Sequence, residues 1–367
     1  MKKFFILFLL LSIFHSCKKE MPTEKPDDNS DKDSTMTADT IFAGGHFLTA
    51  GEQVLNNIGM WDGKKWHPLG TGIRGKNARV ECMAFYKGEL YVGGFIDSAG
   101  SASANHMAKW NGNEWSAVGN GIDGRVTSLI VYQDELYAGG WFFSAEGMDA
   151  GNIAKWNGIS WSSVGEGLSD EVYTLTIYKG LLYAGGWFAK NYEGYFNANR
   201  IARWNGSKWD TVSSGITQGS WIYNLTVFQN ELYAVGYFQR CDDISVSNIA
   251  KWNDTVWSAV GGGIISDLCY TAAEFGNELI IGGKIDSVDN RYMPFSAVWN
   301  GTKWNLGKFV LDAEPYCLIT LKNNLYIGGL FKTADNILIN GIFKWDGEII
   351  HPFDSGVQGY IVSIRGK

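Results

Sequence analysis

The sequence is poor in proline, histidine and cysteine, and it has no excess of basic residues. Its 367 residues include only 6 Pro, 5 His and 5 Cys, and 31 Lys and Arg stand against 38 Asp and Glu, for a net charge of −7. The scarcity of histidine and cysteine leaves few ligands for a metal centre. The acidic balance argues against nucleic acid as a partner, because phosphate binding needs a basic surface.

Long hydrophobic runs are absent except at the N-terminus, which reads MKKFFILFLLLSIFHSC. The run from Phe4 to Phe14 is shorter than the roughly 20 residues that span a bilayer, but two lysines before it are typical of a secretory signal. Its end resembles the bacterial lipoprotein box, in which the cysteine is lipidated. We therefore predict a signal peptide over residues 1–16 and a lipid on Cys17, with cleavage by an ordinary signal peptidase as the alternative.

The segment after Cys17 is almost devoid of apolar residues and rich in Asp, Lys, Ser and Pro. Such a composition cannot bury enough surface to offset its chain entropy. Residues 17–39 are therefore predicted to form the lipidated cysteine and a disordered acidic tether. Together these features predict a protein anchored by lipid to a bacterial outer membrane, facing either the periplasm or the exterior.

Aromatic residues and glycine are abundant, with 16 Trp, 17 Tyr, 20 Phe and 46 Gly, and they recur with a period of 46 to 50 residues. The phrase LYAGGWF occurs at Leu136 and again at Leu182. A Gly-Gly step marks six units, and Val235-Gly236 marks a seventh. Each unit then carries a tryptophan, and six units carry a second one five residues later, where the last unit has Ile350. The paired positions are Trp61 and Trp66, Trp110 and Trp115, Trp156 and Trp161, Trp204 and Trp209, Trp252 and Trp257, Trp299 and Trp304.

Each unit divides into four short strands joined by turns such as Lys179-Gly180 and Asn205-Gly206, which accept the positive φ of tight hairpins. Four antiparallel strands per repeat of this length predict an all-β, seven-bladed propeller over residues 40–367. The first unit lacks a first strand, and the C-terminus supplies one without a successor. We therefore expect Ile361–Ile364 to pair with Ile41–Ala43 and close the ring.

The pattern LYxGGxF…IAKWNGxxWSxVGxG resembles the kelch-type propellers that include the central domain of galactose oxidase. It is more similar to the GGxF…IAxWxG repeats of secreted bacterial lipoproteins and of a fungal cell-polarity landmark protein. The resemblance covers residues 40–367 and implies the propeller fold. It implies no single activity, since such propellers include oxidases, lectins and interaction scaffolds.

Catalytic chemistry finds little support in the residues. A copper oxidase site would need several His and Tyr ligands, and His46 and His106 have no third partner at ligand spacing. A sialidase Asp box is broken by Trp110, and no phosphate loop or nucleophile elbow is present. We predict no cofactor and no metal site, and the residues favour a binding protein over an enzyme. An enzyme would need carboxylates near the central channel, with these candidates: Asp97, Asp170, Glu171, Asp286 and Asp312.

The functional face is predicted to be the one that carries the connections from second to third strands and from fourth to first strands. These loops vary in length and chemistry, whereas the other face has only tight turns. Aromatic side chains beside carboxylates and guanidiniums favour sugar rings as ligands. The candidate contacts are Trp141, Trp187, Tyr192, Tyr195, Phe196, Trp221, Arg240, Asp286, Arg291 and Tyr292.

Alternatives remain for some of these residues. Trp141 and Trp187 follow Gly-Gly directly, where packing between adjacent blades is the favoured interpretation. Cys241 and Cys269 are expected on the same face of neighbouring blades, either as a disulfide or as two small buried thiols. The sequence predicts a monomeric binding module for a glycan or for an envelope or extracellular protein. A protein-interaction scaffold without a small-ligand pocket is the alternative.

Overall fold

The computed structural model describes residues 40–367 apart from residues 193, 195, 196 and 290. The predicted signal peptide, lipidation site and tether at residues 1–39 lie outside the described residues, as do Tyr195 and Phe196. The described residues contain no helix that is long and apolar enough to cross a membrane.

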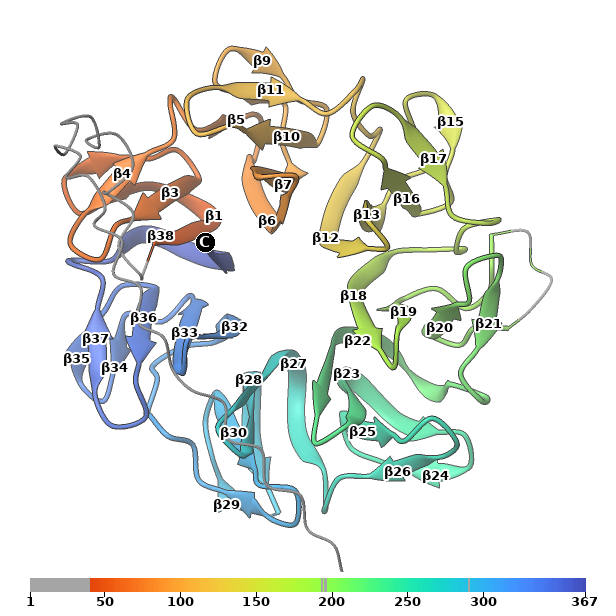
Figure 1. Ribbon diagram of the computed structural model, residues 1–367. Helices are drawn as coiled ribbons and strands as arrows, with labels where there is room; N and C mark the ends of the chain where they lie inside the picture. The colour runs from red at the N-terminus through yellow and green to blue at the C-terminus, as the bar shows by residue number, and fades with distance from the viewer. Residues whose placement is uncertain (1–39, 193, 195–196, 290) are drawn as a thin grey trace, which may run out of the picture. The chain divides into compact units, whose positions relative to one another are not determined.

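Within these residues, seven four-stranded antiparallel sheets surround a central channel (Figure 1). This confirms the predicted all-β propeller. We number the blades by their strands from the channel outward. Blade 1 is β38(Val357–Gly366), β1(Ile41–Ala50), β3(Ile58–Trp61) and β4(Trp66–Pro68); blade 2 is β6(Arg79–Tyr86), β7(Glu89–Phe95), β10(Met107–Trp110) and β11(Trp115–Ala117); blade 3 is β12(Arg125–Tyr132), β13(Glu135–Trp141), β16(Ile153–Trp156) and β17(Trp161–Ser163).

The remaining blades repeat this order. Blade 4 is β18(Val172–Tyr178), β19(Leu181–Gly186), β20(Ile201–Trp204) and β21(Trp209–Thr211); blade 5 is β22(Ile216–Phe228), β23(Glu231–Cys241), β25(Ile249–Trp252) and β26(Trp257–Ala259); blade 6 is β27(Ile264–Phe275), β28(Glu278–Val288), β30(Ser296–Trp299) and β31(Trp304–Asn305); blade 7 is β32(Pro315–Leu321), β33(Asn324–Gly329), β36(Ile342–Trp345) and β37(Ile350–Pro352).

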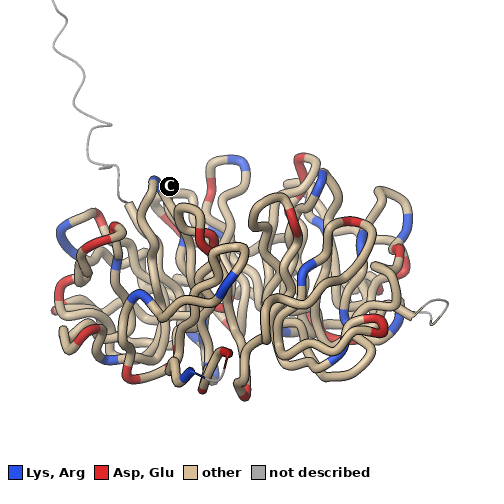
Figure 2. Tube along the Cα trace, turned by 90° about the horizontal axis from the view of Figure 1, so that it is seen from below, with Lys and Arg blue, Asp and Glu red and all other residues tan. Residues whose placement is uncertain are grey.

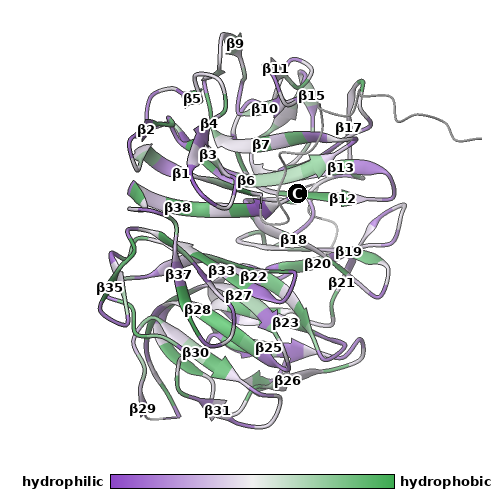
Figure 3. Cartoon of the chain, turned by 60° about the vertical axis from the view of Figure 1, so that its left-hand side comes forward, coloured by the Kyte–Doolittle hydropathy of each residue, from purple (hydrophilic) through white to green (hydrophobic). Residues whose placement is uncertain are grey.

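Short extra strands extend the loops that join second to third strands, and β5(Ile73–Arg74) lies instead in the connection from blade 1 to blade 2. Hydrophobic residues concentrate in the blade strands, and the connecting loops are largely hydrophilic (Figure 3). The extra strands are β2(Gln53–Val54), β5(Ile73–Arg74), β8(Ser98–Ala99), β9(Ala102–Ser103), β14(Ser144–Ala145), β15(Met148–Asp149), β24(Ile244–Ser245), β29(Arg291–Tyr292), β34(Thr333–Ala334) and β35(Ile337–Leu338).

The C-terminal strand closes the ring as the sequence predicted. β38 pairs antiparallel with β1, with Ala43 opposite Ile364 and Gly45 opposite Ile361. Blade 1 is thereby built from both ends of the described chain, and its innermost pair leaves no open sheet edge at the join.

The repeated Gly-Gly step is explained by two close approaches. A Cβ on Gly139 would stand 2.7 Å from Val172 of the next blade, and one on Gly140 would stand 2.0 Å from the carbonyl oxygen of Arg125 in its own blade. The first glycine therefore lets the next inner strand pack against the sheet. In blade 5 this glycine is replaced by Val235, and the facing residue of blade 6 is the small Cys269 in the same core cluster. The two exceptions compensate each other in volume.

The tryptophan pairs hold neighbouring blades together. In each pair the two rings are in contact, and the second indole is buried. Trp161 Nε1 donates a hydrogen bond to the carbonyl oxygen of Val118 in the preceding blade at 3.1 Å. All six second tryptophans make the equivalent bond, at 2.7 to 3.3 Å. Packing between blades therefore accounts for their recurrence.

Candidate functional site

The inner strands enclose a cavity of about 460 Å³ in the central channel. In every blade the pairing of the inner strand with the second strand is interrupted by one residue opposite the Gly-Gly position. Such a bulge leaves one residue unpaired and re-aims its side chain. The seven unpaired residues all line the cavity: Glu81, Thr127, Tyr173, Tyr223, Tyr270, Tyr316 and Val362.

Four consecutive blades place a tyrosine at this bulge, and a fifth tyrosine continues their row. All five are half-buried and line the cavity. We call Tyr173, Tyr223, Tyr270, Tyr316 and Tyr360 the tyrosine arc. Successive rings along it have centroids 5.0, 5.5, 5.3 and 5.7 Å apart.

The tyrosine arc is continuous with aromatic residues at the rim. Trp221 lies two residues before Tyr223, and their ring centroids are 6.2 Å apart. Trp221 also contacts Trp187 at 6.0 Å and Tyr237 at 5.8 Å. We call Trp187, Trp221 and Tyr237 the rim cluster. The result is an unbroken aromatic surface from the long-loop face into the channel.

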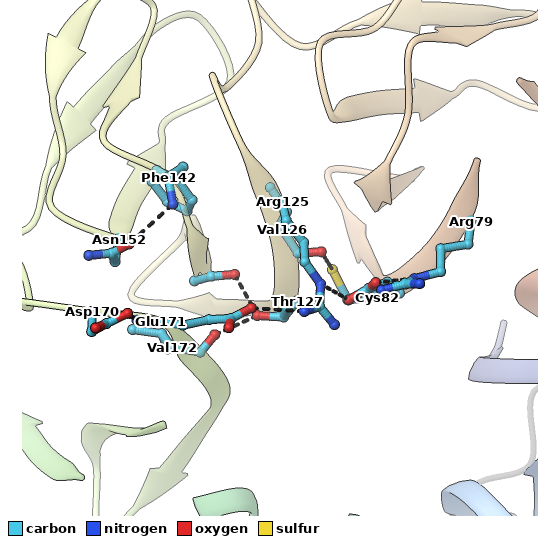
Figure 4. A network of polar contacts seen from close by, with 12 residues as sticks. Arg79, Cys82, Arg125, Val126, Thr127, Phe142, Asn152, Asp170, Glu171 and Val172 are labelled. Carbon is cyan, nitrogen blue, oxygen red and sulfur yellow. Dashed lines mark hydrogen bonds and ion pairs between the residues drawn. The ribbon is translucent and has the colours of Figure 1, made fainter. Parts of the chain in front are cut away.

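The opposite side of the channel carries a charged network, shown in Figure 4. Arg125 Nε lies 2.6 Å from Glu81, and its Nη1 lies 3.0 Å from Glu171. Arg79 pairs with the second oxygen of Glu81 and stacks over the ring of Phe95 at 4.7 Å. We call Arg79, Glu81, Arg125 and Glu171 the charged cluster. Glu81 is almost fully buried, so the two guanidiniums are what make its ionised form tolerable.

Burial controls the protonation of both sides of the cavity. It raises the pKa of the first four tyrosines of the arc, which keeps their hydroxyls protonated as hydrogen-bond donors. Burial also raises the pKa of Glu171, although Arg125 and a hydrogen bond from Tyr173 oppose the shift. The hydroxyls of Tyr223, Tyr270 and Tyr316 have no hydrogen bond to any described residue, so they can donate to a ligand.

The structure separates the predicted rim residues into two groups. Trp187 and Trp221 belong to the rim cluster beside the channel. Trp141 pairs instead with Phe143 at 6.5 Å. Trp141 and Trp187 are 53% and 46% exposed, so the favoured packing interpretation was wrong for both. Both rings are therefore about half exposed, although Trp187 still contacts Trp221 of the next blade.

The other predicted contacts lie farther out and serve their own loops. Arg291 Nη2 donates to the carbonyl oxygen of Trp304 at 2.9 Å, and Arg240 Nη2 donates to that of Asp243 at 3.0 Å. Tyr292, on the outer strand β29, is 78% exposed, more than any other aromatic side chain in the part of the chain that the structure describes. Two further predicted residues, Tyr192 and Asp286, are exposed and belong to neither the rim cluster nor the tyrosine arc.

The disulfide that the sequence left open as one of two alternatives is not formed. Cys241 and Cys269 are both free and buried. Cys241 packs in the core cluster between blades 4 and 5, whereas Cys269 packs with Val235 in the next one and its Sγ lies 3.3 Å from Ser266 Oγ. Two separate hydrophobic cores hold the two thiols, so the alternative of small buried thiols is the one observed.

Of the carboxylates considered for catalysis, Glu171 belongs to the charged cluster. Asp312 accepts hydrogen bonds from the backbone N–H groups of Lys332 and Thr333, and Asp97 accepts one from Lys76. These two therefore serve loop structure. Among the residues that the structure describes, no group of three or more His, Cys, Asp or Glu side chains could hold a metal ion.

The tyrosine arc and two members of the charged cluster were missed by the sequence analysis. A signal existed, because the first strand of four successive repeats contains a tyrosine: VYTL, IYNL, CYTA and PYCL. Simple alternation of strand residues gives no reason to aim these tyrosines at the channel, since the bulge that does so is invisible in sequence.

Comparisons with known proteins agree with the fold. A family model described as the Rax2 C-terminal beta propeller domain matches residues 63–233. Among curated proteins, none matches this chain. The computationally designed protein Ika8 superposes with a TM-score of 0.54 at 14% identity, over 89% of this chain and 91% of that one. The extracellular domain of BT4673 from B. thetaiotaomicron superposes with a TM-score of 0.55 at 13% identity, over 82% of this chain but only 38% of that one. The chain is thus similar to a Rax2-type propeller, and the structural likenesses concern the fold alone.

Proposed function

We propose that this protein is a glycan-binding module whose site is the mouth of the central channel on the long-loop face. One observation carries the proposal: the rim cluster and the tyrosine arc form a continuous aromatic surface that leads into a cavity of about 460 Å³. Sugar rings stack their apolar faces on aromatic side chains, and their hydroxyl edges need hydrogen-bond partners.

The polar groups around this surface support the same proposal. Unbonded tyrosine hydroxyls and the carboxylate of Glu81 supply donors and acceptors within one cavity. A scaffold that binds a protein through a flat rim would have no use for half-buried aromatics inside a channel. The exposed Trp141–Phe143 pair, outside the rim cluster, is the surface that such a scaffold would use instead.

The first experiment measures the thermal stability of the purified full chain against a panel of neutral and acidic oligosaccharides. A ligand at 100 times its dissociation constant stabilises the fold by about 2.7 kcal/mol, which shifts the melting temperature measurably. Trp221→Ala should abolish the shift, whereas Tyr292→Ala, which removes an exposed aromatic outside the rim cluster, should not. A shift that survives Trp221→Ala and disappears with Tyr292→Ala would place the site on the outer rim and contradict the proposal.

We further propose that the module is displayed from a bacterial envelope by a lipid on Cys17. The support is the sequence of residues 1–17, with its two lysines, short apolar run and terminal Ser-Cys. In a bacterial host, wild-type chain should incorporate a labelled fatty acid and fractionate with membranes. Cys17→Ala should lose both properties, and a Cys17→Ala chain that still fractionates with membranes would contradict the lipid anchor.

A further inference from the structure

Arg365 is a cavity residue with no acidic partner among the residues that the structure describes. It lies on β38 at the position that Ile130 and Ile319 occupy in their own blades, and all three line the cavity. Its guanidinium is half-buried and makes one hydrogen bond, from Nε to the carbonyl oxygen of Met83 at 2.6 Å. Four of its five N–H groups have no acceptor among the described residues.

The other two arginines of the cavity are satisfied by the protein. Arg125 is held by Glu81 and Glu171, and Arg79 is held by Glu81. Arg365 therefore differs from both in having a burial cost that the protein does not offset. A buried guanidinium usually has a carboxylate or another anion beside it.

The charge balance of the cavity is opposite to that of the chain. Its lining contains three arginines and one glutamate, and Glu171 outside the lining pairs with Arg125, which leaves one positive charge in excess, although the whole sequence carries 38 acidic and 31 basic residues. The acidic and basic residues of the rest of the protein lie mainly on loops around the ring (Figure 2). A channel lined with excess positive charge between low-dielectric walls concentrates anions.

The neighbours of Arg365 cannot serve as its anion. Cys82 and Cys317 flank it from the two adjacent blades, and burial raises the pKa of both thiols, that of Cys317 to about 12. Both sulfurs are therefore neutral at pH 7. Burial lowers the pKa of the Arg365 guanidinium itself, which agrees with a charge that lacks compensation.

We propose that Arg365 binds the carboxylate of an acidic saccharide whose other rings stack on the tyrosine arc. This inference rests on the proposed function and names its ligand class. Arg365 stands three positions along the strand from the level of Tyr316, which corresponds to about 10 Å at the usual rise of a strand. The ligand is therefore longer than a single sugar ring and enters with its acidic end first. A planar carboxylate matches the free fork of the guanidinium in a bidentate pair.

The test compares a short oligogalacturonate with its methyl ester, which keeps the sugar rings and removes the charge. Affinities are measured by calorimetry for wild type, Arg365→Met and Arg74→Met. Arg74 is an exposed residue of β5 outside the cavity. Arg74→Met therefore serves as the control, since it removes the same charge as Arg365→Met. Wild type and Arg74→Met should prefer the acid over the ester by about 10- to 100-fold, as charge-assisted hydrogen bonds imply. Arg365→Met should lose this preference and keep its affinity for the ester.

Two results would overturn the inference in different ways. If wild type binds acid and ester equally, Arg365 has no role in recognition, while glycan binding itself stands. If neither binds and no neutral oligosaccharide of the panel binds, the proposed function fails and this inference fails with it.

The stability of the unliganded variant supplies a second measurement. Because an uncompensated charge is removed, Arg365→Met should melt at the temperature of wild type or above. A melting temperature several degrees lower would identify Arg365 as a structural tie between β38 and β6 and would also overturn the inference.

Discussion

Two sets of repeated aromatic residues, the second tryptophans and the tyrosine arc, differ in whether their polar atoms have hydrogen-bond partners within the fold. The second tryptophans of six blades are buried, and each donates its Nε1 hydrogen to a carbonyl oxygen of the preceding blade. The tyrosines of the arc are half-buried, and three of their hydroxyls have no hydrogen bond to a described residue. Repetition alone therefore does not distinguish packing from binding. A side chain whose polar atom finds its partner within the fold serves the fold, and one whose polar atom faces a cavity unpaired is available to a ligand.

The largest effect should come from removing a fully partnered aromatic. Trp161→Ala leaves a cavity between blades 2 and 3 and removes one of the two hydrogen bonds that the Val118 carbonyl oxygen accepts, so we expect about 3–5 kcal/mol of lost stability. Denaturant unfolding measures it. Trp161→Phe retains most of the ring volume and should lose less stability. A loss under about 1 kcal/mol for Trp161→Ala would contradict the assignment of the paired tryptophans to the stability of the fold.

A smaller loss is expected at the charged cluster. Arg125→Met leaves Glu81 with Arg79 alone and takes the guanidinium from Glu171, which should cost about 1–3 kcal/mol. The unfolding free energy of this variant is to be compared with that of Arg365→Met, for which no loss is expected. Equal losses of stability in Arg125→Met and Arg365→Met would show that an acidic partner does not determine how much an arginine contributes to stability.

The sharpest matched pair removes one hydroxyl oxygen from each kind of tyrosine. Tyr178 is buried, and its hydroxyl donates to the carbonyl oxygen of Asn230 in the next blade at 3.2 Å. Tyr178→Phe should therefore cost about 1 kcal/mol. Tyr270→Phe should leave stability within about 0.5 kcal/mol and weaken the oligosaccharide-induced shift in melting temperature. A stability loss at Tyr270 as large as that at Tyr178 would assign the arc to the fold.

The smallest effect concerns a partnered carboxylate at the outer edge. Burial works against ionisation of Asp62, but hydrogen bonds from His67 and two backbone N–H groups lower its pKa to about 2. Because folding depresses this pKa from 3.8, the contribution is present above about pH 4 and is lost as pH falls toward 2. Asp62→Asn should flatten the stability profile in that window by less than about 1 kcal/mol, since the pair is partly exposed. If the unfolding free energy of Asp62→Asn changed between about pH 4 and pH 2 as that of wild type does, the Asp62–His67 pair would make no contribution to stability.

The parts of the structure that repeat were the parts that the sequence predicted. The 46- to 50-residue period and the closing pair of Ile364 with Ala43 both follow from local patterns. The direction of Tyr223 or Glu81 depends on a bulge that shifts the alternation by one residue, which a single strand does not reveal. The isolation of Arg365 could not be predicted at all, because the absence of a partner is a property of three-dimensional neighbours.

The compensation between Val235 and Cys269 is another feature that a single repeat of the sequence does not reveal. Each looks like an isolated irregularity in its own repeat, and Cys269 invited a disulfide hypothesis. In the structure they face each other across adjacent blades, where a larger side chain on one side is matched by a smaller one on the other.

The closing strand has a consequence for biosynthesis. β38 contributes Tyr360 and Arg365 to the cavity, so the strand that closes the ring also completes the proposed ligand site. More than 300 residues separate β1 from β38 in the sequence. β1 therefore stays without its inner partner until β38 is available, and this pairing forms late. A chain without β38 would lose two residues of the proposed site as well as the closing pair, so binding there would depend on the integrity of the whole propeller.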